Sequence, residues 1–401
     1  MGDEARGGGP RGPLHPPAAP GTVWRERLTR AALGSFVALA LLLIVEVGAR
    51  AWFGPPVPTD LMARVGTCTV VTTGLRCPGR PEHETVVPPR GARPRVVILG
   101  GSTVRNVFSA DPEADFPFQL QAALPEVEVV NLGISGSTTA SILLLMQDLK
   151  ALEPSLVVLH TGHNDYNFTV FRGEIRAASL WRLPLERALS YSRVYTSVAA
   201  EAPRVVRRDP HATRVLAVQD DIVQRIRPSV DARFRAELTA AVRASPAPVL
   251  VSTLFRNHDF PPTGVLAAAD SACARALAQF QSVRLSSDDE QAVLATCGSE
   301  SSIGRWIRSR DAALPLRERQ AAWRSALDAD DVPMRAPASA DAIIREVAAA
   351  EGVGLVDVAA VADGMQPGAW FIDPLHTTVA GAERLAAGFV APIRVALASS
   401  P

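Results

Sequence analysis

The sequence contains almost no lysine and no excess charge of either sign. Lys150 is the only lysine among 401 residues, and 41 basic residues balance 41 acidic ones. A neutral chain has no basic footprint for nucleic acid, so a nucleic-acid partner is not expected. The scarcity of lysine also removes lysine as a nucleophile almost everywhere. Because 47% of the residues are hydrophobic, a substantial core is still possible.

Cysteine is scarce as well. The four cysteines allow three pairings, and their grouping indicates two local ones, Cys68 with Cys77 and Cys273 with Cys297. The first pair flanks a short predicted hairpin, and the second brackets a segment with helical character. Both pairs would form disulfides outside the cytoplasm. The alternative is that all four are unrelated buried thiols.

The N-terminal region divides into a tail and an apolar segment. Residues 1–30 are rich in glycine, proline and alanine, which predicts a disordered cytoplasmic tail. Residues 31–53 are predicted as a transmembrane helix or signal anchor. No charge occurs from Ala31 to Val45, and the apolar run resumes through Ala49. At about 1.5 Å per residue, this run nearly spans a hydrocarbon core of about 30 Å.

Positive charge immediately before the apolar run predicts the topology. Arg25, Arg27 and Arg30 precede it, so the positive-inside rule places the N-terminus in the cytoplasm and the rest outside, in a bacterial periplasm or at the cell surface. A cleaved signal peptide is an alternative, because Ala49-Arg-Ala51 has the small-x-small form of a cleavage site. A helix buried in a soluble core is the third possibility.

The exported part is predicted as a stalk and one globular domain. Residues 54–94 form a proline-rich stalk that contains the first cysteine pair, and residues 95–401 form the domain, with insertions at 168–247 and 260–335. Five strand-like runs alternate with helical patterns, which indicates an α/β fold with a doubly wound parallel sheet of about five strands. The runs are 95–100, 127–133, 155–161, 248–254 and 353–358.

Polar residues and glycines follow the first four predicted strands, at the sheet edge where ligands bind in such folds. Ser102 follows Gly-Gly after the first strand and is the candidate nucleophile. Asp373 precedes His376 by three residues, so the carboxylate can meet Nδ1 while Nε2 faces the serine. The amides of Ser102 and Gly136 and the side-chain amide of Asn164 are candidate oxyanion-hole donors.

These blocks resemble the SGNH or GDSL hydrolases. Ser102 stands at the family's serine, Gly136 at its glycine, Asn164 in its Gly-x-Asn-Asp block, and Asp373 with His376 in its Asp-x-x-His block. The match runs from the serine to the histidine and leaves out the tail, the membrane segment and the stalk. The resemblance implies a flavodoxin-like sheet and ester hydrolysis through an acyl-enzyme, with no cofactor.

Two positions depart from the family pattern. Gly101 stands where the family usually has an aspartate, which resembles the Gly-Gly-Ser-Thr variant of membrane-anchored bacterial members. Thr377 follows the histidine in place of a frequent proline. The missing aspartate is not the nucleophile, so activity is still expected.

Several polar residues near these blocks have no assigned role. They are predicted to line a substrate pocket or to be plain surface, and they are His163, Asp165, Asn257, His258 and Arg335. Imidazole and carboxylate groups suit zinc, but no dense ligand spacing occurs, so no metal site is expected.

The sequence therefore predicts a membrane-tethered extracytoplasmic serine esterase that removes a short acyl group, for example acetyl, from an envelope carbohydrate or lipid. An acyltransferase that passes the acyl group to a glycan is one alternative. A non-catalytic binding module with the same fold is another, motivated by Gly101 and by the large insertions. The substrate itself is not predicted, because specificity in such folds lies in the insertions.

Overall fold

The structure is a computed structural model, and it describes residues 20–53, 69–71, 74–77, 85–106, 108–146, 148–171, 189, 192–195, 220–262, 272–273, 287–330 and 334–399. Its centre is a five-stranded sheet in the order β5-β4-β6-β7-β8, with every neighbouring pair parallel. This is the doubly wound, flavodoxin-like order, and it confirms the predicted fold class. The strands are β4 (Arg95–Gly100), β5 (Glu128–Gly133), β6 (Leu156–His160), β7 (Val249–Ser252) and β8 (Gly354–Val356).

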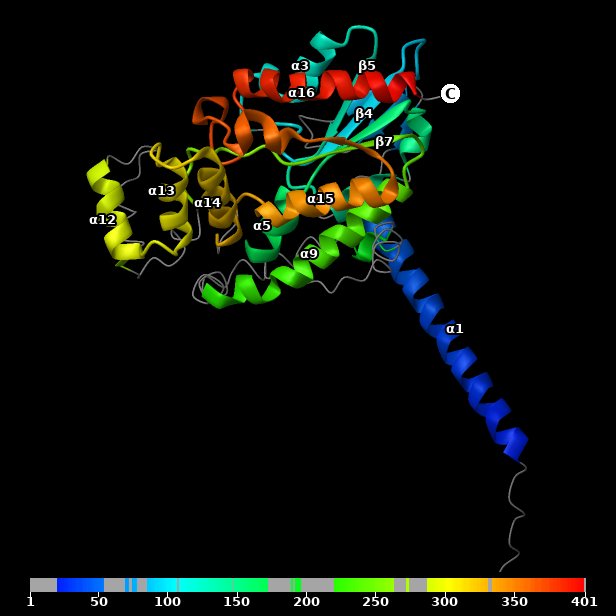
Figure 1. Ribbon diagram of the computed structural model, residues 1–401. Helices are drawn as coiled ribbons and strands as arrows, with labels where there is room; N and C mark the ends of the chain where they lie inside the picture. Colours follow the sequence, from blue (N-terminus) through cyan, green and yellow to red (C-terminus); the bar gives the residue numbers. More distant parts are fainter. Residues whose placement is uncertain are drawn as a thin grey trace, which may run out of the picture.

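Helices cover both faces of the sheet, so its central strands are apolar on both sides. α3 (Phe116–Ala123) and α16 (Val379–Ala398) lie on one face, while α4 (Thr139–Met146), α9 (Asp220–Arg243) and α15 (Ala338–Glu351) lie on the other (Figure 1). Because side chains alternate along a strand, Val96 of β4 packs under α3 and α16, and Val97 packs under α4 and α9.

A small helical cluster lies at one end of the domain, within the second predicted insertion (Figure 1). Its helices are α12 (Ser287–Cys297), α13 (Ser302–Arg310) and α14 (Leu316–Asp328), and they enclose their own core around Trp306 and Trp323. Cys273 is disulfide-bonded to Cys297, as predicted. Cys68 lies outside the described residues, so its predicted pairing with Cys77 stays a prediction.

The N-terminal helix α1 (Pro20–Phe53) projects away from the globular domain (Figure 1). Its segment Arg27–Trp52 is 26 residues long and contains an 18-residue window with a mean hydropathy of 2.3, so its length and composition are sufficient to cross a membrane. The prediction of disorder up to residue 30 is wrong for residues 20–30. Pro20 occupies the first helical position, where its missing N–H costs nothing, and no later residue before the apolar run interrupts the helix.

The stalk region contributes a small antiparallel sheet of β1 (Thr69–Val71), β2 (Gly74–Cys77) and β3 (Thr85–Val87). The hairpin of β1 and β2 was predicted, whereas β3 was not. Helix α5 (His163–Phe171) begins almost directly after β6. Short 3₁₀ turns carry several connections, namely η2 (Pro112–Ala114), η3 (Leu149–Leu152), η4 (Val358–Gly364) and η5 (Gly368–Trp370).

Candidate active site

The candidate nucleophile lies in a tight turn at the carboxyl end of β4. The backbone amides of Val104 and Arg105 donate to the carbonyl oxygen of Gly101 at 3.1 and 3.2 Å. This helical turn places Ser102 at the sheet edge, where it is 7% exposed. Backbone hydrogen bonds therefore fix the turn that carries the Ser102 hydroxyl.

The candidate acid and base lie in a short loop before α16. A bridge between Phe371 and Thr377 closes this loop, and the amide of Ile372 donates to the carbonyl of His376 at 2.9 Å. Oδ1 of Asp373 accepts from the amides of Leu375 and His376, each at 2.8 Å. These bonds leave Oδ2 facing the imidazole.

The three side chains meet at one point. Asp373 Oδ2 lies 2.5 Å from His376 Nδ1, and His376 Nε2 lies 2.8 Å from Ser102 Oγ. Because the carboxylate faces Nδ1, the neutral imidazole carries its proton there and presents Nε2 as an acceptor. Burial raises the pKa of Asp373, but the hydrogen bond and charge of His376 and the loop amides outweigh burial and lower that pKa. The carboxylate is therefore ionised at neutral pH.

Of the candidate oxyanion donors, Asn164 lines the same small cavity as Ser102, and Gly136 directly precedes Ser137, which also lines it. Gly136 has a φ of 78°, a left-handed conformation that glycine adopts without strain. Asn164, in the first turn of α5, donates through Nδ2 to the carbonyl of Ser137 at 2.9 Å. A Cβ at Gly101 would lie 2.5 Å from the same nitrogen. The glycine that replaces the family aspartate therefore leaves room for the Asn164 amide.

Asp165 connects the two helices, α4 and α5, that follow the predicted oxyanion-hole segments. It is 2% exposed and accepts from the amide of Thr139 at 3.0 Å and from its hydroxyl at 3.1 Å. Burial raises its pKa to about 6, although the bonds from Thr139 and the charge of Arg233 act in the opposite direction. Asp165 thus ties the start of α5 to the start of α4, rather than facing a substrate.

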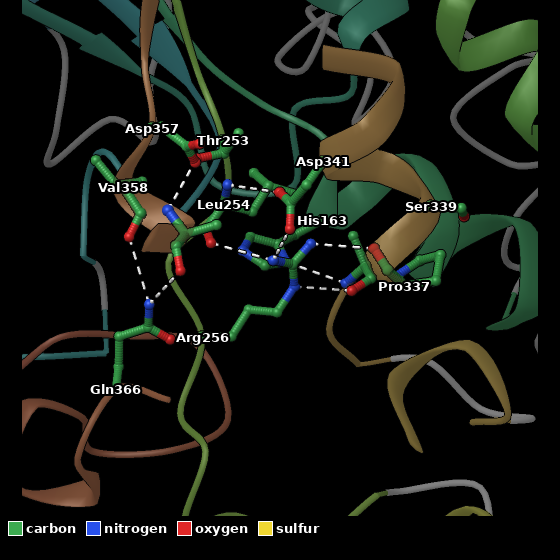
Figure 2. A network of polar contacts seen from close by, with 12 residues as sticks. His163, Thr253, Leu254, Arg256, Pro337, Ser339, Asp341, Asp357, Val358 and Gln366 are labelled. Atoms are coloured by element: carbon green, nitrogen blue, oxygen red, sulfur yellow. Dashed lines mark hydrogen bonds and ion pairs between the residues drawn. The ribbon is translucent and has the colours of Figure 1, made fainter. Parts of the chain in front are cut away.

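His163 is joined to a buried ion pair through the chain that leads into α15 (Figure 2). Its Nδ1 accepts from the amide of Ala336 at 3.1 Å, and Arg256 Nε donates to the carbonyl of Ala336 at 2.9 Å. Arg256 also pairs with Asp341 at 2.6 Å, with both side chains nearly inaccessible. Burial, followed by the charge of Arg256, lowers the pKa of His163 well below its usual value. The ring is therefore neutral.

Asn257, the residue after Arg256, connects the segment that follows β7 to the loop that carries Asp373 and His376. Its amide donates to the carbonyl of Pro374 at 3.0 Å, and its side chain donates to the carbonyl of Asp373 at 3.0 Å. Arg335 in turn donates to the carbonyls of Asn257 and Phe260 at 2.6 and 2.8 Å. Burial lowers the pKa of Arg335 to about 10, so it stays charged. Asn257 and Arg335 therefore support the acid–base loop from inside the domain.

His258 docks the helical cluster onto the sheet. Its Nε2 lies 3.0 Å from the hydroxyl of Ser309 in α13, and its carbonyl accepts from Trp306 Nε1 at 2.8 Å. Of the five residues predicted for a substrate pocket, the structure thus places Asp165, Asn257, His258 and Arg335 inside the protein. Only His163 lines the cavity at the serine.

That cavity is small. It has a volume of about 10 Å³, and its lining residues are Gly101, Ser102, Thr103, Ser137, His160, Thr161, Gly162, His163 and Asn164. A space of this size holds about one water molecule. Among the described residues, no group of three or more His, Cys, Asp or Glu side chains is arranged to hold a metal ion.

Two residues near the site were missed by sequence reasoning. Asn106 is 5% exposed, and its Nδ2 donates to the carbonyl of Thr377 at 2.7 Å, which ties the nucleophile turn to the acid–base loop. The ring of Phe108 lies 4.1 Å from that of His376 and is 60% exposed. Neither residue belongs to a recognisable motif, so the sequence carried no signal for them.

Residues 98–285 match the sequence model of the GDSL-like lipase/acylhydrolase family. No match is found among the curated proteins. Among solved structures, a lipase/acylhydrolase from Enterococcus faecalis is 13% identical, with a TM-score of 0.37, covering 75% of this chain and 96% of its own. An acetylxylan esterase from Geobacillus stearothermophilus, solved as a catalytic mutant, is 14% identical, with a TM-score of 0.35, covering 76% and 95%.

The sheet order and the family match indicate a hydrolase with a flavodoxin-like α/β fold that acts on ester bonds. Residues 98–285 of the globular domain therefore match the GDSL-like lipase/acylhydrolase family, whose members are also called SGNH hydrolases. The resemblance inferred from the sequence is thereby confirmed at the level of the family. The membrane-anchored subtype with a Gly-Gly-Ser-Thr block stays a prediction.

Proposed function

We propose that the protein is a membrane-tethered extracytoplasmic serine esterase that cleaves a short O-acyl ester through an acyl-enzyme. The observation that carries this proposal is the continuous hydrogen-bonded line from Asp373 through His376 to Ser102, with distances of 2.5 and 2.8 Å. A serine hydroxyl is a weak nucleophile, and a base oriented by a carboxylate is what activates it.

The first half of the reaction forms the acyl-enzyme. Ser102 Oγ attacks the ester carbonyl carbon as its proton passes to His376 Nε2, and the carbonyl oxygen becomes an oxyanion. The amides of Ser102 and Gly136 and the Asn164 side chain are the proposed donors to that oxygen. The tetrahedral species then breaks its bond to the alcohol oxygen, which takes the proton from His376 and leaves.

The second half of the reaction releases the acid. Water attacks the acyl carbonyl carbon as His376 Nε2 takes its proton, and the oxyanion forms again at the same donors. The bond to Ser102 Oγ breaks, and the serine recovers its proton from His376. Asp373 stays ionised throughout and stabilises the imidazolium formed in each half. Its lowered pKa fits this role.

The small cavity supports a short acyl group. About 10 Å³ beside Ser102 accommodates little more than a methyl group. We therefore expect aryl acetates to be hydrolysed with a kcat/KM at least about tenfold higher than the corresponding butyrates, because each added methylene fits less well beside Ser102. Equal rates along the acyl series would contradict an acetyl-sized site.

The N-terminal helix supports membrane attachment. α1 has the length and composition to span a bilayer, and Arg27 and Arg30 lie at its N-terminal side. In the proposed topology the N-terminus is cytoplasmic and the catalytic domain is extracytoplasmic. The disulfide of Cys273 with Cys297 fits an oxidising compartment outside the cytoplasm.

A fluorophosphonate probe tests the assignment. The full-length protein in detergent should be labelled at Ser102 and should hydrolyse an aryl acetate. Ser102→Ala should lose both the labelling and the hydrolysis. His376→Ala should have a kcat at least about a thousandfold lower than wild type. Labelling that persists in Ser102→Ala would refute the proposed nucleophile. Wild-type melting behaviour in both variants serves as the folding control.

A further inference from the structure

One charged side chain interrupts the apolar face of α1. Glu46 is the only charged residue between Arg30 and Arg50 in the sequence. Its side chain is 17% exposed, while its neighbours Val45 and Val47 are 54% and 57% exposed. A carboxylate at this place in a membrane helix is costly unless other groups compensate it. The structure shows which groups do so.

The compensating groups come from the first insertion. Glu46 accepts from the Ser192 hydroxyl at 2.8 Å, the Arg193 amide at 2.7 Å and the Val194 amide at 3.2 Å. The Ser192 hydroxyl also accepts from the amide of Tyr195 at 3.1 Å. The amides of residues 193–195 therefore all have acceptors, two of them supplied by the membrane helix. Unpaired amides would be costly in an apolar environment.

The position of Glu46 along α1 fixes the level of this contact in a membrane. Trp24 and Trp52 are 66% and 85% exposed, and they lie about 42 Å apart along an ideal helix. This spacing matches a bilayer of about 40–45 Å including headgroups, with a tryptophan at each interface. Glu46 then lies about 9 Å inward from Trp52, near the boundary of headgroups and hydrocarbon.

We propose that residues 192–195 bind α1 through Glu46 at the extracytoplasmic interface of the membrane. This contact holds the catalytic domain against the bilayer. Its substrate is accordingly an acyl ester carried at the membrane surface, such as an acylated lipid. The inference rests on the proposed function and adds the substrate class. The first insertion follows α5, whose first turn contains Asn164, and Ser192 lies 21 positions after the last residue of that helix, Phe171.

The test uses the full-length protein in phosphatidylcholine vesicles and two substrates. One is a soluble aryl acetate, and the other is a diacylglycerol acetylated on its third hydroxyl. Glu46→Ala should lower kcat/KM for the acetylated lipid about tenfold and change that for the aryl acetate less than twofold. The matched control is Arg50→Ala, which removes the exposed partner of Glu46 at 2.7 Å but none of its bonds to the insertion.

The outcomes separate the two proposals. Wild-type protein that hydrolyses neither substrate would refute the proposed function. Wild-type protein that hydrolyses the aryl acetate alone, or a Glu46→Ala variant that changes both substrates equally or neither, would refute the inference and leave the esterase assignment intact. An equal loss in Arg50→Ala would assign the effect to helix charge rather than to the contact.

Cross-linking tests the contact without reference to activity. A short bis-maleimide should join the introduced thiols of a Glu46→Cys, Ser192→Cys variant in vesicles, because the parent side chains touch at 2.8 Å. The control pair is Val47→Cys with Ser192→Cys, since Val47 is 57% exposed. Equal cross-linking of the two pairs, or none in the first, would overturn the proposed contact.

Discussion

Gly101 shows how a single departure from a family pattern is explained by its surroundings. A Cβ at this position would lie 2.5 Å from Asn164 Nδ2 and 3.4 Å from the carbonyl of Ser137. The first distance is shorter than real contacts allow, so the Asn164 amide would have to move. The glycine therefore belongs with the proposed oxyanion donors rather than with a loss of activity.

Gly101→Ala should slow the reaction through Asn164. We expect kcat to fall by roughly a hundredfold, close to the effect of Asn164→Ala, because losing one oxyanion donor costs about 3 kcal/mol. The double variant should be little slower than either single variant, since both changes remove the same donor. Steady-state kinetics with an aryl acetate measure this. Fully additive losses would show that the two residues act separately.

A second prediction for a single residue concerns Asn106. Its side chain joins the nucleophile turn to the carbonyl of Thr377, which follows the proposed base His376. Asn106→Ala should reduce kcat about tenfold with little change in KM, because the Ser102 to His376 distance is then less well fixed. Asn106→Asp is the matched variant, since it keeps the volume but lacks the donor. A wild-type kcat in both would exclude this role.

The sequence predicts residues that belong to short, contiguous patterns and misses those whose partners are distant. Ser102, Asn164 and the Asp373 to His376 spacing were identified because each sits in a recognisable block. Asn106 bonds to a residue 271 positions away, and Arg256 pairs with one 85 positions away. Nothing local distinguishes these two from surface residues, so only the folded structure assigns them.

Between elements, Asp165 links α4 and α5 through a buried carboxyl group. Burial raises its pKa to about 6, above the value of about 4 expected in the unfolded chain. Protonated Asp165 therefore contributes to the free energy of unfolding. This contribution is complete below pH 4 and is lost as the pH rises through 6. Melting temperatures of wild type and Asp165→Asn should therefore converge at low pH, and wild type should lose stability relative to the variant between pH 4 and 6.

The buried ion pair of Arg256 with Asp341 joins the segment after β7 to α15. Asp341→Asn should destabilise the domain by roughly 3–5 kcal/mol, because the Arg256 charge is left without its partner in the interior. Arg345→Ala is the control, since its ion pair with Asp357 is partly exposed and worth less than about 1 kcal/mol. Chemical denaturation compares them. Equal effects would contradict the importance of burial.

Element types follow from periodicity more readily than element limits do. All five sheet strands were predicted within a few residues, since the apolar runs are strong there. The prediction missed β3, a three-residue strand, and the start of α1. Such short or polar segments owe their structure to pairing partners and to helix continuation, which composition alone does not reveal.

At the scale of the whole molecule, the disulfide stabilises the helical cluster rather than the active site. Cys273 and Cys297 are 24 positions apart, so replacing both with serine should cost about 3 kcal/mol by chain entropy. The melting temperature should fall, while aryl ester hydrolysis at low temperature is retained. Loss of activity in a folded variant would show instead that the cluster shapes the catalytic loop.

The proposed catalytic side chains come from opposite ends of the domain, with 274 positions between Ser102 and His376. In the proposed topology the chain is exported from its N-terminus onward, so the serine crosses the membrane first and its base last. A chain still in transit carries a hydroxyl that nothing deprotonates. Under the proposed mechanism, attack on an ester would therefore begin only after the segment that carries His376 has also been exported.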